Sequence, residues 1–89
     1  MNLDAILGQV LKALRKKHKV SQEELAFRST LDRTYISMLE RGIHQPSLNS
    51  LITMAQIVKI KASDLVSLYE IELEKLNEHN NVNIDEDRP

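Results

Sequence analysis

The chain has 89 residues, of which 42% are hydrophobic, and its net charge at neutral pH is −1. This length supports one domain, and the absence of cysteine excludes disulfide scaffolds and thiolate metal sites. Only two glycines, two prolines, two tyrosines and one phenylalanine are present, which favours an aliphatic helical core over a β-sandwich or barrel. We find no secretory signal and no apolar run long enough to span a bilayer, so we expect a cytoplasmic protein with no membrane partner.

Charge is distributed unevenly along the chain. Residues 12–41 carry eight basic and four acidic side chains, whereas residues 62–89 carry eight acidic and two basic ones. A nearly neutral total can therefore conceal a basic face and an acidic far side. Because helix surfaces are commonly charged, this asymmetry alone is weak evidence for nucleic acid.

Apolar spacing predicts a first helix that closes near Lys17. Its apolar stripe consists of Leu3, Ile6, Leu7, Val10, Leu11 and Leu14. Ser21 and Glu24 have the spacing of a capping box and predict a second, short helix that ends near residues 29–30. Asp32 is suited to cap a third helix that runs to residue 41, and Gly42 is a candidate for its C-terminal cap.

Two further helices are expected in the remaining chain. Ser47, after Pro46, is a suitable cap for a fourth helix, and Ser63 for a fifth. We assign residues 1–77 to one domain that ends in this fifth helix. Residues 78–89 are polar, rich in asparagine and acidic, so we expect a disordered acidic tail.

The second and third predicted helices carry the functional hypothesis. The second is too short to be stable alone, and its apolar residues are explained if it holds the third helix against the core. The third helix then keeps a polar face free, with Arg33 and Thr34 near its start and Ser37 and Met38 one turn later. The major groove of B-DNA admits one α-helix, and arginine suits bidentate contact with guanine. This arrangement predicts a helix-turn-helix partner of double-stranded DNA.

The residues between Val20 and Leu65 resemble the Cro/C1-type helix-turn-helix family, also called the XRE family. The matching runs are Ser-Gln-Glu-Glu-Leu-Ala at 21–26, Tyr-Ile-Ser-Met-Leu-Glu-Arg-Gly at 35–42, Pro-Ser-Leu at 46–48 with leucine at 51, and Ser-Asp-Leu at 63–65. The resemblance implies an all-α, five-helix, lambda-repressor-like DNA-binding domain. It also implies a sequence-specific transcriptional regulator.

Two shorter runs are similar to controller proteins of restriction–modification systems. They are Leu-Ala-Phe-Arg-Ser at 25–29 and Leu-Asp-Arg-Thr-Tyr-Ile-Ser at 31–37. This similarity implies control of restriction–modification genes and of the chain's own gene. The second run also occurs in phage-derived repressors and uncharacterised regulators, so the subfamily stays open.

The family resemblance assigns roles residue by residue. Gln22 matches a position that holds a DNA phosphate, and Tyr35 matches one that touches the backbone or senses DNA shape. The positions that read bases correspond to Arg33, Thr34 and Met38, and those that grip the far phosphate correspond to Gln45 and Asn49. Arg15 and Glu40 match a buried structural ion pair.

Two residues depart from the family pattern. Thr30 occupies a turn position often held by glycine, and a left-handed β-branched residue is costly, so a different type of turn is an alternative. Met38 has no group that can hydrogen-bond a base, so it would pack on a thymine methyl or fill space. Both departures affect the expected base specificity.

The fifth predicted helix has an apolar band wider than one contact face requires. We assign five of its residues to a homodimer interface: Leu65, Val66, Leu68, Tyr69 and Ile71. An alternative is that this helix wraps deeper into its own core. A dimer would place two recognition helices about 34 Å apart on a pseudo-palindromic operator.

Other functions are less well supported by the residues. His18, His44 and His79 lack metal-ligand spacing, so we assign no metal, and we expect no cofactor or small-molecule ligand. No catalytic set or phosphate-binding glycine loop is evident, so we do not expect an enzyme. The rival hypothesis is a protein-interaction module, such as an antitoxin, whose acidic tail binds a partner. An adjacent toxin gene would favour that rival.

Overall fold

The computed structural model describes residues 2–80, and within that range it contains five helices and no strand. The helices are α1 Leu3–Lys17, α2 Gln22–Ser29, α3 Arg33–Glu40, α4 Leu48–Ile57 and α5 Ala62–Asn80. The predicted five-helix, all-α architecture is confirmed. Residues 78–80, which we assigned to the acidic tail, are helical, and the rest of that tail lies outside the described residues. No helix in this range is long and apolar enough to cross a membrane.

Side-chain caps start the first four helices. Asn2, Ser21, Asp32 and Ser47 each accept a hydrogen bond from a backbone amide two or three residues later, at 3.0–3.1 Å. Each bond satisfies an amide that has no partner within the helix. Three of these four caps were expected from the sequence, because their side chains and spacing are local signals.

The start of α5 differs from the prediction. The helix begins at Ala62, so Ser63 lies in its first turn and not at its cap. The carbonyl of Lys61 accepts the amides of Asp64 and Leu65, both at 3.0 Å. The chain therefore turns into the helix one residue earlier than the serine signal indicated.

Left-handed residues end several helices, and most of them are not glycine. Lys19, Thr30 and Lys59 have φ angles of 58°, 58° and 59°. After α1 and α4, the amides of the next residues donate back to carbonyls inside the helix at 3.1 and 2.9 Å, which satisfies groups that would otherwise lack partners. Gly42, the predicted cap after α3, has a φ of 77°, and a Cβ there would lie 2.6 Å from the Cα of Ala5.

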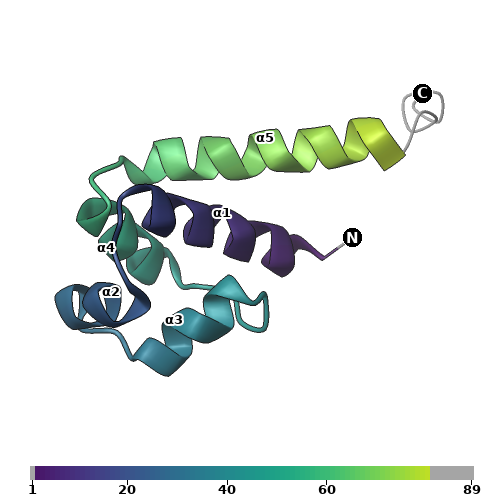
Figure 1. Cartoon of the computed structure of the whole chain (residues 1–89). Coiled ribbons are helices and arrows are strands. Elements are labelled where there is room, and N and C mark those ends of the chain that lie inside the picture. Colours follow the sequence, from purple (N-terminus) through teal and green to yellow (C-terminus); the bar gives the residue numbers. More distant parts are fainter. Residues whose placement is uncertain (1, 81–89) are drawn as a thin grey trace.

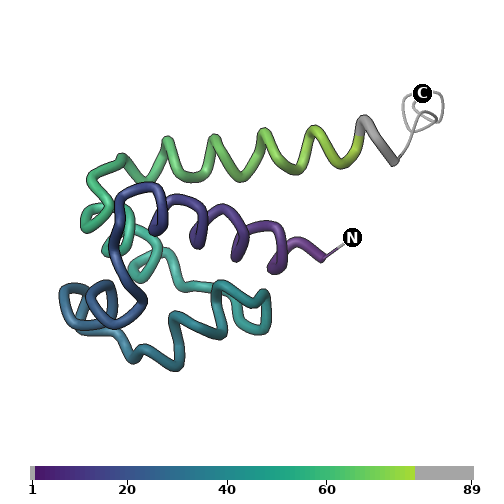
Figure 2. Tube along the Cα trace, viewed as in Figure 1, coloured from purple at the N-terminus to yellow at the C-terminus, as the bar shows by residue number. Residues whose placement is uncertain are grey.

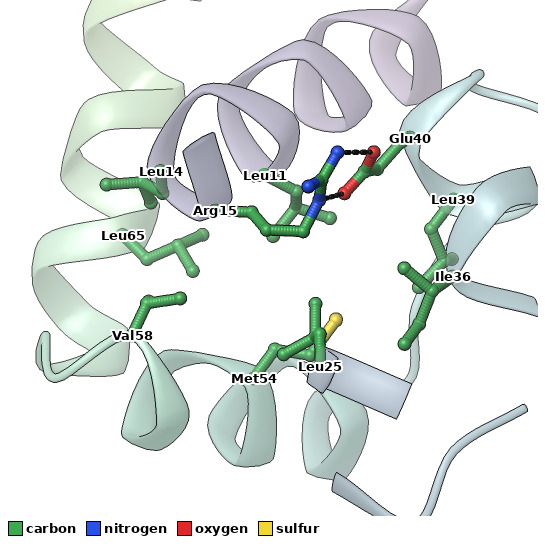
Figure 3. A pocket seen from close by; sticks show the side chains of 10 residues that line it. All are labelled: Leu11, Leu14, Arg15, Leu25, Ile36, Leu39, Glu40, Met54, Val58 and Leu65. Atoms are coloured by element: carbon green, nitrogen blue, oxygen red, sulfur yellow. Dashed lines mark hydrogen bonds and ion pairs between the residues drawn. The ribbon is translucent and has the colours of Figure 1, made fainter. Parts of the chain in front are cut away.

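α1 lies between α3 and α5, and α5 runs antiparallel along it (Figures 1 and 2). α2 packs on both α3 and α4, and α4 packs on α5, so the helices enclose a single core. The core is aliphatic, as the composition predicted. Its most deeply buried large side chains are Ile36, Leu39 and Leu65, each 1% exposed (Figure 3).

α1 and the end of α3 approach each other closely at Gly8. A Cβ at this position would lie 2.4 Å from the carbonyl oxygen of Leu39 and 2.6 Å from that of Glu40. Glycine inside a helix costs stability through its backbone entropy. Here the missing side chain allows the α3 backbone to lie directly against α1.

We expect Gly8→Ala to destabilise the fold by about 1–3 kcal/mol, because the new methyl group collides with backbone carbonyls that cannot rotate away. Helix propensity alone predicts the opposite sign, a gain of about 1 kcal/mol. Urea denaturation followed by circular dichroism measures the difference. Gln9→Ala, at the exposed neighbouring position, is the control, and a stabilised Gly8→Ala protein would contradict the close approach.

Candidate nucleic-acid interface

Residues 30–32 form the tight turn between α2 and α3. Thr30 is left-handed, so the alternative of a different turn type is wrong. Ser29 braces the corner, because its hydroxyl accepts the Leu31 amide at 3.2 Å and donates to the Ala26 carbonyl at 3.3 Å. These bonds help to offset the cost of a left-handed β-branched residue, about 1–2 kcal/mol.

A buried ion pair fixes the end of α3 to α1 (Figure 3). Arg15 Nε donates to Glu40 Oε2 at 2.6 Å, and Arg15 Nη2 donates to Glu40 Oε1 at 3.0 Å. The side chains are 9% and 3% exposed. Arg15 Nη1 also donates to the Val20 carbonyl at 2.8 Å, so the guanidinium is bonded on several sides. The predicted structural ion pair is confirmed.

Gln22 joins this network from the start of α2. Its Nε2 donates to Glu40 Oε1 at 3.0 Å, and its side chain is half-buried. Sequence reasoning gave Gln22 only a phosphate-binding role and missed this bond. The amide is therefore held in place by the same carboxylate that anchors α3.

Five polar residues line a shallow hollow on the outer face of α3: Gln22, Arg33, Thr34, Ser37 and Arg41. Four of them were predicted DNA contacts, and the structure brings those four together. Arg41 was missed because we treated it only as the end of the helix. Its position, four residues after Ser37 and eight after Arg33, places it on the same helix face.

The hollow presents two guanidinium groups. Arg33 Nη1 lies 3.8 Å from Glu23 Oε2, and the two side chains are 59% and 75% exposed. Such an exposed pair contributes little, so Arg33 can exchange this partner for a ligand. Arg41 Nε donates to the Ser37 carbonyl at 3.4 Å. The surface therefore offers positive charge and several N–H donors, as a phosphate or a guanine edge requires.

The other predicted contact residues lie outside this hollow. Tyr35 and Met38 are half-buried, and Tyr35 packs against the core. Gln45 is exposed in the loop before α4, and Asn49 is exposed in the first turn of α4. Their roles toward DNA stay predictions.

The predicted dimer residues on α5 fall into two groups. Leu65 is 1% exposed, so it belongs to the core of its own chain and is removed from the dimer interface. Tyr69 is half-buried, and its hydroxyl donates to the Leu3 carbonyl at 3.2 Å. Burial raises the pKa of Tyr69, with a smaller contribution from the charge of Asp4, so the hydroxyl stays protonated to a higher pH than usual. Val66, Leu68 and Ile71 are 37%, 38% and 44% exposed.

Comparison with known proteins is consistent with this geometry. The helix-turn-helix family HTH_3 matches residues 11–65, which contain the whole of α2, α3 and α4. Over 66 residues the chain is 36% identical to control protein C.BamHI of Bacillus amyloliquefaciens. The matched region covers 73% of this chain and 82% of that protein.

Two other similarities bear on length and fold. The immunity repressor protein of Bacillus phage phi105 is 35% identical over 74 residues, but that match covers 83% of this chain and only 51% of the repressor. The restriction–modification controller protein C.Esp1396I was solved as a variant bound to its highest affinity operator site. That structure has a TM-score of 0.73 at 28% identity and covers 81% of this chain and 95% of its own.

We expect Glu40→Ala to destabilise the fold by about 3–5 kcal/mol, because it leaves the Arg15 guanidinium buried without its counter-charge. Gln22→Ala removes one hydrogen bond and should cost about 1 kcal/mol. Urea denaturation measures both. The double variant Arg15→Met, Glu40→Leu should recover most of the loss, whereas a Glu40→Ala protein as stable as the wild type would show that the ion pair does not hold α3.

Proposed function

Because this chain belongs to the Cro/C1-type (XRE) helix-turn-helix family, we propose that it regulates transcription by binding a pseudo-palindromic operator as a homodimer. The observation that carries the proposal is the cationic hollow on the outer face of α3, lined by Gln22, Arg33, Thr34, Ser37 and Arg41. One side of α3 is held against α1 and its outer face is polar, so the helix can enter the major groove without rearrangement.

Residues on α3 divide between reading bases and holding the backbone. Arg33 and Thr34 lie in the first turn, where side chains of a recognition helix reach base edges. Ser37 and Met38 follow one turn later, and the Met38 side chain would contact a thymine methyl. Tyr35 would touch the DNA backbone or respond to its shape.

Phosphate contacts would come from the elements around α3. Gln22 is at the N-terminus of α2 and Arg41 directly follows α3, so they can hold the strands that flank the groove. Gln45 and Asn49 would reach the far phosphate. Such contacts supply affinity that falls with salt, whereas base contacts supply sequence choice.

We further propose that the regulated genes are those of a restriction–modification system and the chain's own gene. This is supported by the similarity to control protein C.BamHI, 36% identical over 66 residues, and by the likeness in structure to the restriction–modification controller protein C.Esp1396I. A homodimer through α5 would place both recognition helices on one operator. The DNA target implies a cytoplasmic location.

Arg33→Ala should weaken binding to the specific operator by about 1–3 kcal/mol and leave binding to random DNA almost unchanged, because a base contact is lost. The operator is first located by footprinting upstream of the chain's own gene, and binding is then measured by fluorescence anisotropy. Arg28→Ala is the matched control, since Arg28 pairs with Glu24 at 3.4 Å and does not line the hollow. Equal losses of binding affinity for the operator and for random DNA would show that Arg33 contacts only phosphate.

At micromolar protein concentration, Ile71→Glu should convert the dimer to monomer. It should weaken operator binding strongly and lower the melting temperature only slightly. The reason is that Ile71 is 44% exposed, so a carboxylate there is tolerated by the fold but not by an apolar interface. Sedimentation velocity measures the assembly and anisotropy the binding. A wild-type monomer that binds a palindromic operator tightly would refute the homodimer.

A further inference from the structure

One face of α5 has a residue order that can pair with itself. Asp64, Leu68, Ile71 and Lys75 follow at steps of four, three and four residues, so they form one line along the helix. We call this line the α5 seam. Leu65, one residue after Asp64, faces the core, so the α5 seam lies beside the core contact and not within it.

The α5 seam is open to solvent. Leu68 and Ile71 are 38% and 44% exposed, and the Lys75 side chain is 67% exposed. Leu68 also borders a groove between α5 and α1, whose other wall includes Ile6 and Ala13. Exposed leucine and isoleucine beside an apolar groove are typical of a surface that another helix covers.

The α5 seam is complementary to a second copy of itself that runs in the opposite direction. When two identical helices pack antiparallel about a two-fold axis, the first residue of the line faces the last residue of its partner. Asp64 would then face the partner's Lys75, and Leu68 would face the partner's Ile71. Each contact occurs twice, so the interface contains two ion pairs that flank two apolar pairs.

Resting on the proposed homodimer, we propose that α5 packs antiparallel against α5 of a second copy, in the register that pairs Asp64 with Lys75 of the partner subunit. Lys75 is the only lysine or arginine in α5, whereas five residues of this helix are acidic: Asp64, Glu70, Glu72, Glu74 and Glu78. On the α5 seam itself, Asp64 is the one acidic residue and Lys75 the one basic residue, so pairing them leaves no like charges facing each other across the seam. Charge pairs that flank an apolar seam set register and partner choice in paired helices.

Lys75 is available for this contact. Within its own chain, its Nζ lies 3.2 Å from Glu72 Oε2, and the two side chains are 67% and 47% exposed. An exposed pair three residues apart on one helix is weak, so Lys75 can also hold a partner's carboxylate. Asp64 is likewise exposed, in the first turn of α5.

The test exchanges these charges in the full chain. Asp64→Lys and Lys75→Asp, each alone, should weaken self-association about tenfold, because each homodimer then contains two like-charged contacts. A 1:1 mixture of the two variants should form heterodimers, in which both positions again carry opposite charges. Sedimentation equilibrium measures the affinities, and native mass spectrometry measures the heterodimer fraction.

Glu70→Lys is the matched control, because Glu70 is exposed on α5 but borders a different hollow, with Leu73 and Asn77. It should leave self-association unchanged. Circular dichroism of each variant shows whether α5 still forms, since Asp64 also lies at a helix start where negative charge is favourable. A heterodimer fraction above that of random mixing supports the register.

A dimeric wild type whose charge variants mix at random would overturn the register and leave the homodimer intact. A monomeric wild type would overturn the homodimer itself. The double variant Asp64→Lys, Lys75→Asp should dimerise nearly as well as the wild type, because both pairs are reversed together. A double variant as weak as the single ones would also overturn the register.

Discussion

The buried contact between Arg15 and Glu40 is the constraint on which the rest of the molecule depends. It joins the C-terminal turn of α1 to the last residue of α3, and Gln22 of α2 bonds the same carboxylate. A buried charge pair gives little net stability compared with apolar packing, but its geometry is exacting. The pair therefore holds the end of α3 at one place on α1, beside the close backbone approach at Gly8.

Gln22 extends that constraint to the proposed DNA surface. Its Nε2 is engaged by Glu40, yet the residue also lines the hollow in front of α3. The same side chain therefore contacts both the buried network and the surface that would meet phosphate. A ligand at the hollow would find the amide already oriented, which lowers the entropy lost on binding.

Sequence signals were sufficient where the structure is determined locally. Ser21, Asp32 and Ser47 cap their helices as expected, because a cap depends on a few neighbouring residues. The same holds for the polar face of α3, which follows from helical periodicity. The Arg15–Glu40 pair was expected only through the family resemblance, because no pattern along the chain joins positions so far apart.

The errors arise where tertiary contacts decide the outcome. Thr30 is left-handed despite its branched side chain, because Ser29 and the packing of α2 against α3 hold the corner. Leu65 looked like an interface residue on α5, but α4 and α1 cover it completely in the same chain. Gly8 gave no signal at all, since only the nearness of α3 explains a glycine in mid-helix.

α1 is the element through which the two proposed surfaces are related. On one side, Gly8 and Arg15 hold it against α3 by backbone approach and by the ion pair. On the other, the Tyr69 hydroxyl donates to the Leu3 carbonyl, and Leu65 packs in the core with Leu14. In a dimer joined through α5, the separation of the two recognition helices would thus be set by how rigidly α1 links α3 to α5. Loosening either side of α1 would then blur the half-site spacing of that dimer while leaving every proposed DNA contact in place, so the proposed operator discrimination would depend on the core as well as on the surface.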